Sequence, residues 1–157
     1  SKQTVVPLLM FTSDIQALGL KQTAGMTFTE GWYWDFNDSN RKFAQRFMKE
    51  FKGKAPTSVQ AGVYSSTMQY LKAVEVAKTD NADAVMKQMK SVEINDGLFK
   101  GRIRADGKFE HDMYLLEVKK PSDSKSPWDY YNVKAVIPAA EATQPLSLSR
   151  CKLVTNK

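Results

Sequence analysis

The residues best placed to bind a small polar ligand lie in the stretch Phe11-Thr12-Ser13-Asp14. They end an apolar run, residues 5–11, that is typical of a buried strand, and they precede a short helical pattern through Ile15, Ala17 and Leu18. In open α/β sheets, ligands bind outside the carboxyl ends of the strands. Hydroxyl and backbone N–H groups at a helix start can hold a polar or anionic group there. Helix capping explains the same residues equally well, so both interpretations stay open.

A second candidate feature is the densest aromatic cluster of the chain, formed by Trp32, Tyr33, Trp34 and Phe36. Aromatic side chains bury large areas, and packing in the core is the favoured interpretation. The alternative is that some of them line a ligand cleft, where aromatic walls and a few polar groups are usual.

Motifs of catalysis and of cofactor binding are missing from the sequence. It contains neither a glycine-rich phosphate loop nor the GxSxG or HExxH pattern, and its single His and single Cys cannot form a His/Cys zinc site. His111 lies between Glu110 and Asp112, where an exposed strand residue is favoured over an acid–base role. We therefore expect no catalytic residue, no metal and no cofactor, and we interpret the protein as a non-enzyme.

The net charge and the length of the apolar runs exclude further classes of protein. The 157 residues include 23 Lys+Arg and 17 Asp+Glu, a net charge of +6. The two halves of the chain share this excess evenly and contain no long basic run, so binding to nucleic acid is not expected. The longest apolar run, seven residues, is far below the roughly 20 that a membrane span needs. Cys151 cannot form a disulfide within the chain, and it is a thiol or half of a bridge to another chain or segment.

The elements that position these residues alternate between strands and helices. Residues 5–11, the short helix and a β-rich stretch at 26–34 read as strand, helix and strand, the unit of a parallel sheet. Three helical patterns follow. The first is capped by Asn37-Asp38-Ser39 and carries the apolar stripe Phe43, Phe47 and Phe51; the others cover residues 59–78, after Thr57-Ser58, and 82–92.

Beyond Gly97 the hydrophobic period changes to two. Residues 99–104 and 109–118 flank Ala105-Asp106-Gly107, and Asp-Gly is a strong signal for a hairpin turn. A surface loop at 121–127, a last strand at 128–137 and an irregular polar tail complete the chain. This order of elements predicts an α/β fold.

Several segments together are similar to one protein family. The ensemble resembles the C-terminal half of type I periplasmic binding proteins, the solute-binding proteins of ABC importers, in the family that binds branched-chain amino acids and aromatic acids. The resemblance covers nearly all residues, and it rests on the order and spacing of these segments: Glu30-Gly31-Trp32-Tyr33-Trp34-Asp35, Pro56-Thr57-Ser58-Val59-Gln60-Ala61-Gly62-Val63-Tyr64-Ser65, Arg104-Ala105-Asp106-Gly107, Tyr114-Leu115-Leu116-Glu117-Val118-Lys119, Pro127-Trp128-Asp129-Tyr130-Tyr131 and Cys151-Lys152-Leu153-Val154.

The resemblance implies a partial chain of a protein about twice as long. Family members fold as two Rossmann-like lobes of three-layer αβα architecture and trap the ligand between the lobes by hinge closure. Residues 1–35 would belong to the second lobe, 36–110 to the first lobe, and 111–157 to the second lobe and a C-terminal tail. A missing N-terminal half would carry the signal peptide, and a cysteine there is the predicted disulfide partner of Cys151. The chain opens almost at once into a predicted strand, so we expect association with the missing half or with a second copy.

The resemblance also implies a function and a site. The protein would be the periplasmic, extracellular ligand-binding component of an ABC importer, capturing a small carboxylate such as an aromatic acid or a branched-chain amino acid and delivering it to the permease subunits. The alternative is a ligand-sensing receptor or regulator of the same fold. Asp14 is the candidate partner of a ligand ammonium group. The expected ligand-binding residues are Phe11, Thr12, Ser13, Asp14, Tyr33, Trp34, Val59, Gln60 and Tyr64.

Overall fold

The computed structural model describes residue 3 and residues 5–155, which form two compact units. Unit 1 comprises the chain up to residue 61 together with residues 113–136, and unit 2 comprises residues 62–112 together with the chain from residue 137 onwards. Each unit holds a three-stranded sheet and helices, which confirms the predicted α/β class. The division into lobes at 1–35, 36–110 and 111–157 stays a prediction.

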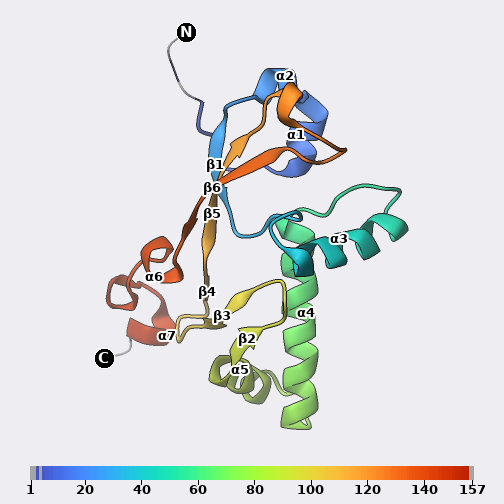
Figure 1. Ribbon diagram of the computed structural model, residues 1–157. Coiled ribbons are helices and arrows are strands. Elements are labelled where there is room, and N and C mark those ends of the chain that lie inside the picture. The colour runs from blue at the N-terminus through green and yellow to red at the C-terminus, as the bar shows by residue number, and fades with distance from the viewer. Residues whose placement is uncertain (1–2, 4, 156–157) are drawn as a thin grey trace. The chain divides into compact units, whose positions relative to one another are not determined.

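The sheet of unit 1 has the order β1-β5-β6, with the strands Thr27–Glu30, Met113–Val118 and Tyr131–Ile137. β1 pairs antiparallel with β5, and Phe28 lies opposite Leu116. The short helices α1 (Thr12–Leu18) and α2 (Leu20–Thr23) lie beside this sheet (Figure 1). Burial of apolar surface between the helices and the sheet forms the core of the unit. Its buried members are Ile15, Phe28, Tyr33, Leu116, Val118, Tyr130 and Tyr131.

The strand predicted at residues 5–11 is wrong. Residues 5–11 contain no strand, and Leu8 and Leu9 are 101% and 76% exposed. A strand needs a hydrogen-bonding neighbour, and the neighbour of β1 in the described part of the chain is β5. The predicted parallel strand–helix–strand unit is therefore replaced by an antiparallel pair between β1 and a strand more than eighty residues later.

Three other predicted strands differ in their limits. The stretch at 26–34 is a strand only over Thr27–Glu30, and the last strand begins at Tyr131 instead of residue 128. The stretch at 109–118 is divided at Asp112 into β4 and β5, which belong to different sheets. Alternation of side chains continues across such a break, and so the sequence pattern does not reveal it.

The three longer helices are confirmed, and they are α3 (Asp38–Glu50), α4 (Ser58–Ala77) and α5 (Ala82–Ser91). The side chain of Asn37 accepts a hydrogen bond from the backbone N–H of Asn40 at 2.8 Å, and Asn81 caps α5 in the same way through Ala84 at 3.2 Å. No helix in the described part of the chain, α4 included, combines the length and apolar character that crossing a bilayer requires.

The sheet of unit 2 has the order β2-β3-β4, with the strands Glu93–Asn95, Lys100–Ile103 and Phe109–His111. Both pairs are antiparallel, so the predicted hairpin is confirmed, whereas β2 was not predicted.

Two predictions for the second half of the chain need correction. His111, predicted to be exposed, is half-buried against the rings of Phe99 and Phe109, at centroid distances of 5.4 and 4.7 Å. The tail expected to be irregular contains the short helices α6 (Ala139–Ala142), η2 (Leu146–Leu148) and α7 (Lys152–Thr155), while η1 (Pro121–Asp123) lies in the predicted loop of unit 1.

The turn between β3 and β4 is fixed by an ion pair. Gly107 has a φ of 84°, and its N–H donates to the carbonyl of Arg104 at 2.9 Å. The guanidinium of Arg104 contacts the carboxylate of Asp106 at 2.5 Å, and both side chains are only 8% exposed. Arg104 also donates to the carbonyl of Gln144 at 2.8 Å, and the thiol of Cys151 lies 3.6 Å from the carbonyl of Asp106, so the turn holds the C-terminal segment. The predicted turn role of Asp106 is confirmed.

Candidate ligand-binding site

The most unusual polar group of unit 1 is the carboxyl group of Glu30, the last residue of β1. Side chains alternate along a strand, so Glu30 shares a face with Phe28. That face is the buried one: Phe28 is 3% and Glu30 is 5% exposed. Within the described part of the chain, the Oε1 atom of Glu30 has no hydrogen-bond partner. Buried carboxyl groups are costly unless they are paired, and most native ones are satisfied.

Two tyrosine hydroxyl groups are in the same situation. Tyr33 follows β1 and Tyr131 opens β6, and both are 3% exposed. Their rings lie 5.0 Å apart between centroids, and the ring of Tyr131 meets Phe28 edge-on at 5.3 Å. Neither hydroxyl makes a hydrogen bond of good geometry with a described residue, although Thr12 lies close to the hydroxyl of Tyr131 and the backbone of Tyr130 and Tyr131 lies close to the hydroxyl of Tyr33. We define Glu30, Tyr33 and Tyr131 as the buried polar cluster.

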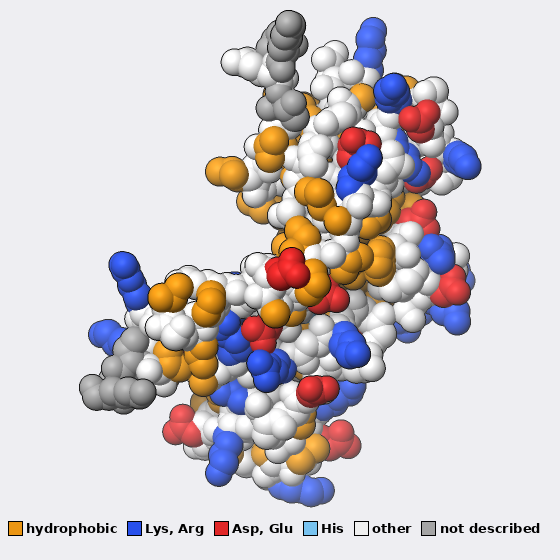
Figure 2. Space-filling model, turned by 60° about the vertical axis from the view of Figure 1, so that its left-hand side comes forward, with side chains coloured by type: hydrophobic (Ala, Val, Ile, Leu, Met, Phe, Trp, Pro, Cys, Tyr) orange, Lys and Arg blue, Asp and Glu red, His pale blue; other side chains and the backbone are white. Residues whose placement is uncertain are grey.

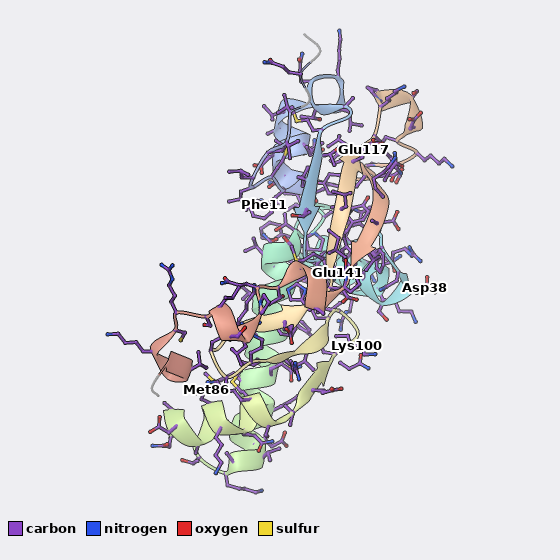
Figure 3. All side chains as sticks on the ribbon, turned by 90° about the vertical axis from the view of Figure 1, so that its left-hand side faces the viewer. Phe11, Asp38, Met86, Lys100, Glu117 and Glu141 are labelled. Carbon is purple, nitrogen blue, oxygen red and sulfur yellow. The ribbon has the colours of Figure 1, made fainter. Side chains whose placement is uncertain are left out.

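The start of α1 borders this cluster. Thr12 is 1% exposed, and its side chain lies close enough to the hydroxyl of Tyr131 to lower the pKa of that hydroxyl. Asp14 lies close enough to Glu30 for its negative charge to raise the pKa of the Glu30 carboxyl group. The Asp14 carboxylate also accepts a hydrogen bond from the backbone N–H of Phe11 at 2.7 Å, which gives Asp14 a role in capping. Phe11 is the N-cap of α1, so Thr12, Ser13 and Asp14 form the first turn of the helix instead of preceding it as predicted. Figure 3 marks Phe11 near the carboxyl end of β1.

The charged residues that act on the buried polar cluster are acidic. Burial, and after it the negative charge of Asp14, raises the pKa of Glu30 to about 8. Burial also raises the pKa of Tyr131, and the negative charge of Glu30 raises it further. Burial likewise raises the pKa of Tyr33, with smaller contributions in the same direction from Asp129 and Asp35. Desolvation disfavours the charged form of each group. Every formal charge that shifts these three groups is negative.

The aromatic residues next to the cluster are mainly packed against one another. Trp32 is fully buried and meets Phe43 edge-on at 5.8 Å, and Phe36 stacks on Tyr114 at 4.3 Å. The indole N–H of Trp34 donates to the carbonyl of Trp128 at 2.9 Å. Trp34 is half-buried beside the cluster through its edge-on contact with Tyr33 at 6.1 Å. Packing in the core, the favoured interpretation of this segment, agrees with these contacts.

The predicted ligand-binding residues of α4 have other surroundings. The side-chain oxygen of Gln60 accepts from the backbone N–H of Thr57 at 2.8 Å and from its hydroxyl at 2.6 Å, which is the geometry of a capping box. Val59 and Tyr64 are 50% and 41% exposed. Their ligand-binding role stays a prediction.

The structure thus brings three predicted residues, Thr12, Asp14 and Tyr33, together with two that the sequence reading did not propose, Glu30 and Tyr131. The alternation of β1 could have indicated Glu30, because a carboxyl group two residues after Phe28 falls on the face that Phe28 buries. Tyr131 comes from a strand more than ninety residues away, and no local pattern connects the two.

Comparison with protein families identifies the class of the chain. The sequence profile of the periplasmic binding protein family matches residues 1–125. The chain belongs to the periplasmic binding protein family. This confirms the resemblance seen in the sequence and its type I fold.

Two solved structures from Burkholderia are similar to the whole chain. A periplasmic binding protein from Burkholderia mallei is 49% identical, with a TM-score of 0.91 over 94% of this chain and 39% of its own. A branched-chain amino acid ABC transporter periplasmic ligand-binding protein from Burkholderia xenovorans LB400 is 38% identical, with a TM-score of 0.91 over 97% of this chain and 41% of its own. The chain therefore spans about two fifths of the length of these relatives.

A more distant structure shares the fold. The leucine-, isoleucine-, valine-, threonine- and alanine-binding protein from Brucella ovis, in a closed conformation, is 16% identical, with a TM-score of 0.69 over 85% of this chain and 36% of its own. No curated protein sequence matches the chain.

Proposed function

We propose that this chain is part of the ligand-binding component of an ABC importer, which captures a small carboxylate, such as a branched-chain amino acid or an aromatic acid, in the periplasm. The similarity to the Burkholderia xenovorans protein, at 38% identity, supports the transport role. The observation that carries the proposal is the buried polar cluster. Small-molecule sites combine apolar and aromatic walls with a few polar groups, and here three polar groups lie buried among aromatic side chains, each with an oxygen atom that makes no hydrogen bond of good geometry.

The apolar surface supports a further part of the proposal. Hydrophobic side chains reach the surface in Figure 2, and Leu8, Leu9, Val63 and Val76 are each more than half exposed. Exposed apolar patches mark interaction sites. We propose that residues 1–35 and 111–157 belong to one lobe and 36–110 to the other, and that the polypeptide which completes the lobes covers these side chains. Permease subunits are the proposed partners of the assembled protein.

Binding to the intact protein tests the function. Because a ligand stabilises the state that binds it, leucine, isoleucine, valine, benzoates and cinnamates are screened for a rise in melting temperature. Calorimetry then measures the affinity of each ligand that stabilises. We expect at least one of them to bind, and failure of all of them would refute the proposed ligand class.

A pair of variants tests the site. Tyr131→Phe removes a buried hydroxyl and keeps the ring, so we expect weaker binding of the ligand. Tyr70→Phe makes the same change on α4, where the side chain is 43% exposed, and is expected to bind like the parent. Equal affinities of the two variants would show that the cluster does not contact the ligand.

A further inference from the structure

The charges around the buried polar cluster define what it can accept. The titratable groups around Glu30 are Asp14 on α1, Tyr131 on β6 and Tyr114, which lies opposite Glu30 on β5, and Tyr33 joins them through its ring contact with Tyr131 at 5.0 Å. Among them is a second carboxyl group but no cation. A buried carboxylate is stable only beside a positive charge, so the unliganded cluster favours the protonated, neutral acid.

We propose that Glu30 exchanges its proton for the cationic group of a ligand, so that capture of the ligand releases a proton to the solvent. The O–H bond of the acid breaks, the proton leaves to water, and the carboxylate accepts a hydrogen bond from an ammonium group. The hydroxyls of Tyr33 and Tyr131, which make no hydrogen bond of good geometry with a described residue, can accept further hydrogen bonds from the same group. This inference rests on the proposed function and selects amino acids over acids that lack an amine.

The size of the effect follows from the state of Glu30 in the empty site. A pKa of about 8 leaves about nine-tenths of Glu30 protonated at pH 7. Binding an ammonium group should then release about nine-tenths of a proton at pH 7 and about half a proton at pH 8. The apparent affinity should rise about ninefold between pH 6 and pH 7.

Calorimetry on the intact protein tests the proposal. L-leucine is titrated beside 4-methylpentanoate, and L-phenylalanine beside 3-phenylpropanoate, since each pair differs by the amine. At pH 7 the titrations are run in phosphate and in Tris, because a released proton is taken up by the buffer and contributes its ionisation heat. We expect an amino acid to bind with a buffer-dependent enthalpy, and its deaminated partner to bind much more weakly.

Two variants test whether the released proton comes from Glu30. Glu30→Gln should abolish the buffer dependence and weaken binding of the amino acid, while the matched exchange Glu50→Gln, at an exposed position of α3, should preserve both. A buffer-independent enthalpy for the parent, or equal affinity for a deaminated acid, would overturn the proton exchange and leave the proposed function standing. If none of the four compounds, nor any member of the wider screen, binds, the proposed function itself fails and takes this inference with it.

Discussion

The buried carboxyl group of Glu30 makes the stability of the protein depend on pH. Its pKa is about 8 in the folded state against an ordinary value of 4.5, so the folded protein holds a proton that the unfolded chain loses at lower pH. The stabilising contribution of the protonated acid is complete below about pH 4.5 and is lost as the pH rises towards 8.

The magnitude follows from linkage. Each pH unit inside this window costs about 1.4 kcal/mol, and between pH 5 and pH 7 the loss amounts to about 2.5 kcal/mol. Glu30→Gln is neutral at every pH and escapes this loss. We expect its free energy of unfolding to gain about 2.5 kcal/mol relative to the parent between pH 5 and pH 7.

Guanidinium unfolding at pH 5, 6 and 7 measures this difference. The three tryptophans of the chain, Trp32, Trp34 and Trp128, all lie in unit 1, so their fluorescence reports on the part that contains Glu30. Other titrating groups contribute equally to both proteins and cancel in the comparison. Glu50→Gln, whose carboxyl group is in solvent, is expected to follow the parent. Parallel pH profiles for Glu30→Gln and the parent would refute the reasoning.

Chemical unfolding of three further variants, two of them measured beside a matched control, tests the packing and the cap of α3. Leu116→Ala empties a fully buried site and should cost about 2–5 kcal/mol, while Leu71→Ala, 52% exposed on α4, should change the free energy by no more than about 0.5 kcal/mol. Gly101→Ala would place a Cβ atom 2.1 Å from a backbone oxygen of β4 and should destabilise strongly, while Gly62→Ala, with no neighbour within 4 Å, should stabilise by up to about 1 kcal/mol. Asn37→Ala should cost about 1 kcal/mol through loss of the cap of α3.

For each of these expectations, a specific result would contradict it. Similar losses for the two leucine variants would show that Leu116 is not part of a packed core. A Gly101→Ala variant as stable as Gly62→Ala would contradict the close approach of β3 and β4. A stable Asn37→Ala variant would mean that water satisfies the helix start equally well.

The parts of the fold that could be predicted are those that local chemistry decides. The side chain of Asn37 caps the helix that follows it, and Asp106 and Gly107 close a turn between neighbouring strands, so residues a few positions apart hold all the information. The predicted bounds of the longer helices were accurate for the same reason.

The errors concern features that depend on distant segments. Residues 5–11 have the composition of a strand, but a strand exists only beside a partner, and β1 pairs with β5. Two of the five residues of the candidate site, Thr12 and Asp14, were predicted from the start of α1, whereas Tyr131 joins them through the sheet order β1-β5-β6. Glu30 was overlooked because a carboxyl group in a short strand is usually read as facing the solvent.

The ion pair in the turn between β3 and β4 also affects the chemical degradation of the protein over time. Aspartyl–glycine bonds degrade when the glycine nitrogen attacks the side-chain carbonyl of the aspartate, loses water and forms a cyclic imide. Here Arg104, as the largest cause, lowers the pKa of Asp106, and an ionised carboxylate is a poor electrophile. The N–H of Gly107 is at the same time committed to the carbonyl of Arg104. The same contacts that fold the hairpin thus protect its most fragile peptide bond against spontaneous isomerisation during storage.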